Sequence, residues 1–342
     1  MGFEFEIRIR GCCNNEANFK FTSLECLKNS DALEKRMSLL KKLTAFILII
    51  AAVLTGAAFA VVLTPPQVDN TAFIDLPAPD IKNGQQMFWA GGCAGCHAAP
   101  AATGDQRLVL SGGLAIKSDF GTFHAPNISP DPQAGIGAWS VPEFANAVRK
   151  GIGPDGENLY PSLPYTSYVR MTNQDVKDLF GYIMTLPESS QPDKPHDLAF
   201  PFSFRPALAF WKELYFSDQP RVEISGASAQ VERGQYLVEG PGHCGECHTP
   251  RTRLGGPEYD HWLAGGPNPD GPGMVPNITP GSTVIGSWSA SEIADYLETG
   301  FTPEYDVVGG SMVEVQKNLA HLPRSDLEAI AAYLKAVPAL QN

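Results

Sequence analysis

Two short cysteine motifs carry the clearest chemistry in this chain of 342 residues. One reads CAGCH over residues 93–97, and the other reads CGECH over residues 244–248. Cys-x-x-Cys-His is the pattern of covalent haem c attachment, in which both thiols bond to one porphyrin and the adjacent histidine binds its iron. The sequence therefore predicts two covalently bound haem c groups, held by Cys93, Cys96, Cys244 and Cys247, with His97 and His248 as iron ligands.

Other uses of paired cysteines fit these motifs less well. A disulfide or a thioredoxin-like redox pair does not need the histidine that follows each pair. A zinc ribbon places its two Cys-x-x-Cys knuckles about 15–20 residues apart, whereas these motifs begin at residues 93 and 244. Zinc is therefore a poor second interpretation.

The haem motifs lie in an internal sequence repeat. Three stretches of the first half recur in the second half in the same order: GGCAGCHAAP (91–100) as GHCGECHTPR (242–251), APNISP (125–130) as VPNITP (275–280), and GIGAWSVPEF (135–144) as VIGSWSASEI (284–293). Similarity at a nearly constant spacing indicates a duplicated domain. We expect a first domain over residues 75–190 and a second over residues 230–340.

The same three helices are expected around each haem motif. The first begins near Ile81 or Val231 and ends just before the cysteines. The second begins at a Ser-x-x-Glu capping box and ends at Gly151 or Gly300, the usual residue type at a helix C-terminus. The third has apolar residues at helical spacing and ends before a proline. No comparable alternating strand pattern is present, so the fold class is mainly α with long Gly/Pro-rich loops.

The two domains are joined by residues 191–229, which are dense in aromatic side chains (FPFSFRPALAFWKELYF). The simplest interpretation is an interdomain strap that packs against both domains. The alternative is a docking surface for a membrane or a partner protein.

The chain resembles a dihaem member of the class I cytochrome c family, of the kind that serves as the cytochrome subunit of membrane-bound bacterial alcohol and sugar dehydrogenases. The resemblance covers nearly all of residues 75–340 and implies two tandem class I cytochrome c domains. It also implies a glycine of the first helix against an aromatic residue of the last, and loops and tryptophans near the haem edges. The matching positions are Gly84 with Tyr182, Gly234 with Tyr333, the loops 126–128 and 276–278, and Trp139 and Trp288, which could equally be core residues.

Two methionines are expected to complete the iron coordination. The resemblance places this ligand in the loop between the second and third helices. Counting 12 residues from the helix-ending glycines reaches Met312 in the second domain but Leu163 in the first. Counting back from the third helix reaches Met171 in the first domain but Leu322 in the second. We therefore predict Met171 as the sixth ligand of the first haem and Met312 as that of the second.

The remaining histidines suit a ligand role less well. His124 aligns with Met274 and is the alternative sixth ligand of the first haem. His243 precedes Cys244, and we expect it to meet solvent or a haem propionate. Surface positions are expected for the other histidines outside the motifs, His196, His261 and His321.

Iron bound by histidine and methionine has no open position for a substrate, and methionine ligation raises its potential. We therefore expect an electron-transfer protein without catalytic residues. It would take electrons from an exported dehydrogenase and pass them to a respiratory-chain acceptor such as the quinone pool, a cytochrome or an oxidase. The alternative is a dihaem enzyme such as a peroxidase with one open haem iron. An enzyme with a cysteine-ligated haem is disfavoured because the exported part has no further cysteine.

The net charge of the chain indicates which classes of binding partner are favoured. The chain has 37 acidic and 25 basic residues, a net charge of −12. This is the wrong sign for binding the phosphates of nucleic acid. An acidic body suits a basic protein partner.

The N-terminal region resembles an export signal. An uncharged run from Thr44 to Leu63 follows Lys41 and Lys42, which is typical of a signal peptide and also long enough to span a membrane. Residues 37–63 are therefore expected to be a signal peptide or a retained anchor at the bacterial inner membrane. The flanking positive charges place everything after Pro65 on the periplasmic side.

Signal peptides begin at or near the true start of a protein, so we predict that translation starts at Met37 and that residues 1–36 are a miscalled extension. Cys12, Cys13 and Cys26, the three cysteines outside the haem motifs, lie in that extension. Mass spectrometry of tryptic peptides from native membranes checks this prediction. Any peptide from residues 1–36 would contradict it.

Overall fold

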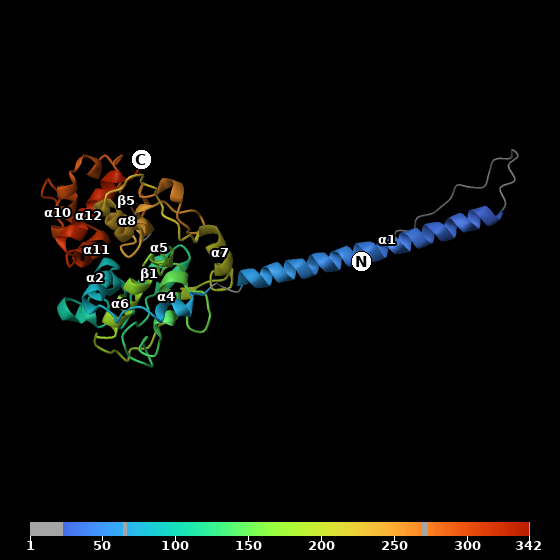
Figure 1. Cartoon of the computed structure of the whole chain (residues 1–342), viewed down its shortest axis with the longest axis horizontal. Coiled ribbons are helices and arrows are strands. Elements are labelled where there is room, and N and C mark those ends of the chain that lie inside the picture. The colour runs from blue at the N-terminus through green and yellow to red at the C-terminus, as the bar shows by residue number, and fades with distance from the viewer. Residues whose placement is uncertain (1–22, 64–66, 269–272, 342) are drawn as a thin grey trace. The chain divides into compact units, whose positions relative to one another are not determined.

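The computed structural model describes residues 23–63, 67–268 and 273–341. They divide into two units at Val61. In the N-terminal unit, α1 (Ser23–Leu63) is a continuous helix (Figure 1). Its stretch Lys35–Ala57 is long and apolar enough to cross a membrane, a test that a signal sequence also passes. Cys12 and Cys13 lie outside the described residues.

The second unit contains both cysteine motifs, and the first repeat surrounds the first motif. Its elements are η1 (Asn70–Phe73), α2 (Ile81–Ala90), α3 (Cys93–His97), η2 (Gly104–Leu108), β1 (Ala115–Ser118), β2 (Gly121–His124), α4 (Val141–Lys150), α5 (Tyr165–Tyr168) and α6 (Asn173–Ile183). The connection to the second repeat holds β3 (Asp197–Leu198) and α7 (Ala207–Tyr215).

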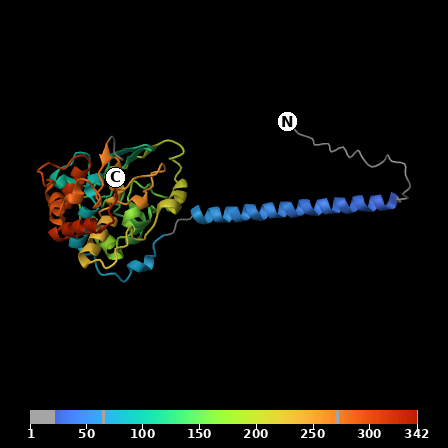
Figure 2. The same ribbon diagram turned by 90° about the horizontal axis from the view of Figure 1, so that it is seen from above.

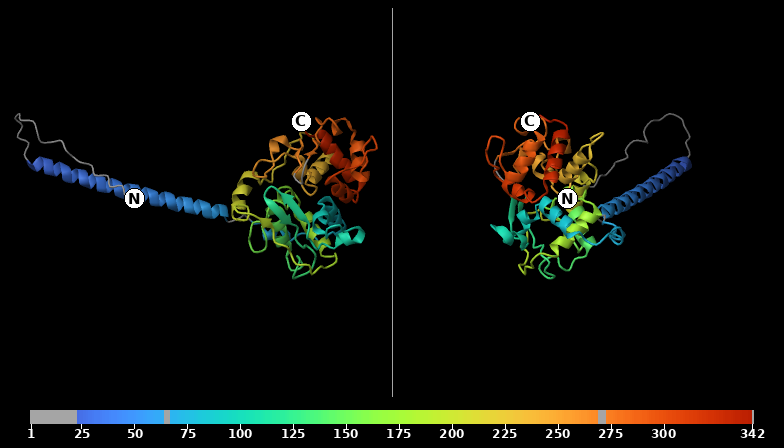
Figure 3. Two further views of the ribbon diagram at one scale, coloured as in Figure 1. Left: turned by 180° about the vertical axis from the view of Figure 1, so that it is seen from behind. Right: turned by 60° about the vertical axis from the view of Figure 1, so that its left-hand side comes forward.

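The second repeat follows the same plan. Its elements are α8 (Ala229–Glu239), α9 (Gly245–His248), η3 (Tyr259–His261), β4 (Gly266–Pro267), β5 (Met274–Val275), η4 (Ile285–Ser287), α10 (Ala290–Thr299), α11 (Met312–Leu319) and α12 (Arg324–Ala336). The mainly α fold is confirmed. Figures 2 and 3 show this repeat, coloured orange to red, lying against the cyan-to-green first repeat.

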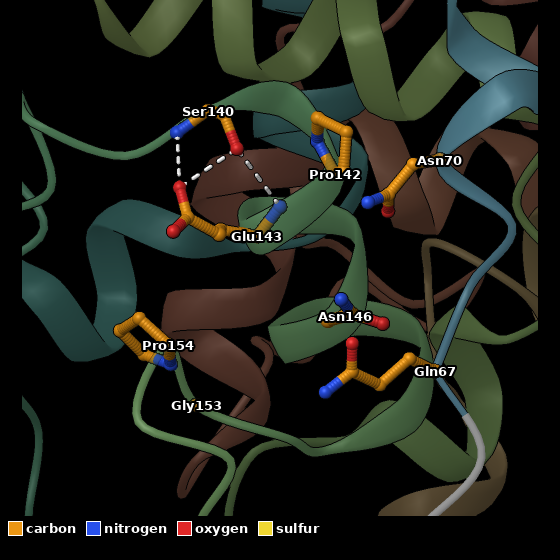
Figure 4. A pocket seen from close by; sticks show the side chains of 8 residues that line it. All are labelled: Gln67, Asn70, Ser140, Pro142, Glu143, Asn146, Gly153 and Pro154. Carbon is orange, nitrogen blue, oxygen red and sulfur yellow. Dashed lines mark hydrogen bonds between the residues drawn. The ribbon is translucent and has the colours of Figure 1, made fainter.

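The predicted ends of the second helix of each repeat are confirmed. Ser140 and Glu143 form a complete capping box at the start of α4, as do Ser289 and Glu292 at the start of α10. Figure 4 shows the first box, beside a polar pocket at the N-terminal end of α4. Both helices end at a glycine in the left-handed conformation, which a residue without a Cβ adopts at little cost.

Short strands precede the repeated Pro-Asn-Ile loops and were not predicted. In the first repeat β2 pairs antiparallel with β1 and β3, and in the second β5 pairs with β4. These strands are 2 to 4 residues long, too short for their sequences to show alternation. Their effect is to fix where each loop begins.

The first and last helices of each repeat cross in close contact. A methyl group in place of the Gly84 hydrogen would lie 2.0 Å from the backbone oxygen of Asp178 and 2.8 Å from Cβ of Tyr182. At Gly234 the same distances, to Ala329 and Tyr333, are 1.9 and 2.8 Å. The glycine–aromatic contacts implied by the family resemblance are thus confirmed in both repeats, and α2 packs on α6 as α8 packs on α12.

The aromatic-rich connection makes hydrogen bonds to both repeats. Lys212 donates hydrogen bonds of 2.8 Å to the carbonyl oxygens of Lys150 and Gly151 in the first repeat. Trp211 donates one of 2.9 Å to the Leu254 carbonyl oxygen in the second. Part of the apolar surface of this connection remains exposed to solvent. The exposed side chains are Phe200, Phe202, Phe204, Phe210 and Leu214.

Replacing Gly234 by alanine is expected to lower the free energy of unfolding by about 1–3 kcal/mol, because the added methyl group forces α8 away from α12. The matched control is Gly309→Ala, where a methyl group meets nothing within 4 Å. Thermal denaturation followed by circular dichroism measures both. Equal melting temperatures for the two variants would contradict the close crossing.

Candidate haem sites

Each cysteine motif forms a short helix at the end of the first long helix of its repeat. In the first repeat the turn is made by Gly92, whose φ of 59° is left-handed. Cys93 and Cys244 are half-buried thiols. Burial, together with the neighbouring cysteine of the motif, raises the pKa of each to about 12.

The motif histidines are oriented by one hydrogen bond that is the same in both repeats. Nδ1 of His97 lies 2.8 Å from the Pro126 carbonyl oxygen, and Nδ1 of His248 lies 2.8 Å from that of Pro276. A carbonyl oxygen only accepts, so Nδ1 carries the proton and donates it. Burial lowers the pKa of both imidazoles, opposed by this bond. A neutral ring with Nε2 unprotonated is the form that binds iron.

The loops that supply these carbonyls are themselves anchored. Nδ2 of Asn127 donates to the carbonyl oxygens of Ser189 (2.7 Å) and Gln191 (2.9 Å), just after the first repeat's last helix. Nδ2 of Asn277 donates to that of Leu340 (2.7 Å) in the second repeat. The asparagine of each Pro-Asn-Ile loop therefore holds the chain end that closes its repeat.

This donor set fits haem c, and comparison with known proteins supports the same conclusion. The cytochrome c family model matches residues 81–187. A dihaem c-type cytochrome of Cereibacter sphaeroides is 52% identical over 84% of this chain and 96% of its own length. The chain belongs to the dihaem c-type cytochromes. It carries two covalently bound haem c groups, and its function is electron transfer.

Other relatives are larger than this cytochrome. The fructose dehydrogenase cytochrome subunit of Gluconobacter japonicus is 39% identical over 76% of the chain, which spans 53% of that subunit. The cytochrome c subunit of a quinone-dependent alcohol dehydrogenase of Gluconacetobacter polyoxogenes is 37% identical over 79% of the chain, which spans 59% of it. None of these three relatives is named as a peroxidase.

The predicted methionine ligands lie in different surroundings. Met312 is the first residue of α11 and is half-buried, as is Leu163, its counterpart in the first repeat. Met171 is only 2% exposed and belongs to the core, as does its counterpart Leu322. Tyr168 lies three residues before Met171. Its hydroxyl donates a hydrogen bond to the Gly91 carbonyl oxygen beside the first haem motif (3.0 Å).

His124, the alternative sixth ligand of the first haem, lies in β2 just before the first Pro-Asn-Ile loop. It is two residues from Pro126, whose carbonyl accepts the hydrogen bond from Nδ1 of His97. His124 is 5% exposed, and its Nδ1 is buried without a hydrogen-bond partner among the described residues. The backbone amide of His124 donates to Nδ1 of His196 (3.1 Å).

Of the three histidines expected at the surface, His261 and His321 are exposed and His196 is not. His196 is half-buried against the rings of Phe123 and Tyr160, with centroid distances of 5.6 and 5.2 Å. His321 is exposed, as expected, and its ring also stacks on that of Trp89 of the first repeat, with a centroid distance of 3.9 Å. For His243 the expectation of solvent or a propionate did not include a further contact, in which its Nε2 lies 3.2 Å from the Gly91 carbonyl oxygen.

Polar contacts between the repeats were missed by sequence reasoning. Glu246, inside the second haem motif, accepts hydrogen bonds from Thr166 (2.6 Å) and Ser167 (3.0 Å) of α5 and pairs with Arg251 (2.6 Å). Its burial would raise its pKa, but Arg251 and these bonds outweigh burial, and the pKa is lowered. An acidic residue between the motif cysteines was the available signal, since Gly95 stands there in the first repeat.

Proposed function

We propose that this cytochrome takes electrons from an exported dehydrogenase and passes them to a respiratory-chain acceptor at the periplasmic side of the bacterial inner membrane. The observation that carries the proposal is the likeness to cytochrome subunits of fructose and alcohol dehydrogenases, which extends over 76% and 79% of this chain. The acceptor is the quinone pool, a cytochrome or an oxidase.

The residues around each motif support a carrier. When bound, each haem supplies a reversible one-electron couple. The chain orients His97 and His248 through the proline carbonyls, so the ligand side of the site is preorganised. Because each repeat supplies its own motif and its own oriented histidine, one chain can hold two such couples.

The charge and the N-terminal helix support the proposed location. Residues 1–60 contain 8 basic and 6 acidic residues, so the remainder has 17 basic and 31 acidic residues and a net charge of −14. Such a surface attracts a basic face on a partner. The apolar stretch Lys35–Ala57, preceding this acidic body, acts as a signal or as the anchor.

For the sixth ligands we propose Met171 in the first repeat and Met312 in the second. Met312 is supported by its half-buried position in the loop region between α10 and α12, next to the core. Met171 is supported by the sequence argument and by its nearness to Tyr168, three residues before it, which contacts the first motif. Leu163 and Leu322 then serve as the apolar counterparts, since leucine and methionine have similar bulk.

The experiment for the overall function uses membranes from bacteria that express the chain. We expect a panel of alcohols and sugars to include a substrate that reduces the cytochrome, followed by its α-band. The rate should fall with added salt, because charges are screened over about 10 Å at 0.1 M. The control is the Cys93→Ala/Cys244→Ala variant, which cannot hold the haems fully. High-spin iron with peroxide turnover, and no reduction by any substrate, would move the assignment to the enzyme alternative.

For the ligands, Met171→Leu and Met312→Leu should each abolish the sulfur-to-iron charge-transfer band of one haem and lower its potential, since thioether ligation raises it. Met184→Leu, at the end of α6, is the control and should retain both bands. Absorption spectra and redox titration of the purified variants provide the measurements. Two unchanged bands in Met171→Leu would exclude that residue as a ligand.

A further inference from the structure

The residues just before the two haem motifs contact each other at one backbone oxygen. The carbonyl of Gly91, two residues before Cys93, accepts a hydrogen bond from the Tyr168 hydroxyl (3.0 Å) of its own repeat. It also accepts one from Nε2 of His243 (3.2 Å), the residue directly before Cys244. Since a carbonyl cannot donate, His243 carries its proton on Nε2.

The backbone of His243 has an uncommon conformation. Its φ is 39°, in the left-handed region that residues with a Cβ rarely adopt. The repeat alignment pairs His243 with Gly92, which has a φ of 59°. Both repeats therefore make the same turn before their first cysteine, but only the second repeat uses a residue that is strained in it. Strain of this kind persists only where the surrounding structure holds the residue in place.

The neighbouring contacts hold the imidazole in place. The His243 amide donates to the Gly240 carbonyl oxygen (3.1 Å), and its own carbonyl accepts from the Glu246 amide (2.9 Å). The ring meets that of Tyr168 edge-on at 5.7 Å. The ring is therefore fixed from both repeats.

We propose that the His243–Gly91 hydrogen bond couples the two haems for electron transfer. It completes a route that runs from Cys93 through Gly92 to the Gly91 carbonyl, across the hydrogen bond to His243, and on to Cys244. Every other step of that route is a covalent bond. One electron moves from the reduced haem of one motif to the oxidised haem of the other, and His243 keeps its proton throughout.

The proposal concerns electron transfer within the chain, so it does not depend on the donor or the acceptor. The role proposed for His243 also differs from simply holding the two repeats together, because other contacts do that as well. His321 stacks on Trp89, and Arg170 pairs with Glu239 at 3.6 Å. Neither contact lies on the route between the two cysteines.

The test compares three variants of the full holoprotein. His243→Gly restores the residue found in the other repeat, which removes both the strain and the hydrogen bond. His243→Gln keeps a donor with similar reach. His321→Asn is the matched control, an interface histidine away from the route. Electrons are injected by pulse radiolysis, and the redistribution between the haems is followed optically. Both potentials are measured by equilibrium redox titration, and unfolding midpoints are recorded.

We expect His243→Gly to slow the exchange severalfold with both potentials and the unfolding midpoint unchanged, and His243→Gln to restore most of the rate. His321→Asn should exchange electrons at the wild-type rate. In the reduced wild-type protein, proton NMR should show a slowly exchanging imidazole proton that is lost in His243→Gly. The proposal is overturned if His243→Gly exchanges electrons at the wild-type rate, or if the slowing follows from shifted potentials alone.

Discussion

The structure depends on holding an imidazole so that one nitrogen is available to iron. In both repeats this is done by a proline carbonyl that accepts the Nδ1 proton at 2.8 Å. The rest of the repeat follows from that need. Short strand pairs fix where the proline loop begins, and asparagines at 127 and 277 tie it to the end of the repeat. The crossing at Gly84 and Gly234 then brings the first helix, which leads into the motif, against the last.

Much of this could be predicted because it is local and repeated. The capping boxes at Ser140 and Ser289 and the terminal glycines after α4 and α10 are short patterns whose meaning does not depend on the rest of the chain. Duplication strengthened each of them, since a feature that recurs at the same place in both repeats is unlikely to be accidental. The motif cysteines and histidines were assigned in the same way.

What escaped prediction depends on how the two repeats dock. His243 and Gly91 are 152 residues apart in sequence. A local sequence pattern cannot indicate a contact between residues so far apart. Glu239 of the second repeat is 1% exposed and pairs with Arg170 of the first repeat at 3.6 Å. The one available sign was asymmetry. At two positions where the repeats differ, Gly92 against His243 and Gly95 against Glu246, the residue of the second repeat contacts the first repeat.

The docking also makes each repeat support the region of the other that is proposed to supply a ligand. Beside Met171, Arg170 donates to the Glu239 carbonyl oxygen (3.1 Å) of the second repeat. Farther along α11 from Met312, Asn318 accepts from Arg107 (3.0 Å) of the first repeat. Because each segment between the second and third helices is braced by the opposite repeat, the two haem environments are built together, and duplication has produced one interdependent unit rather than two independent carriers.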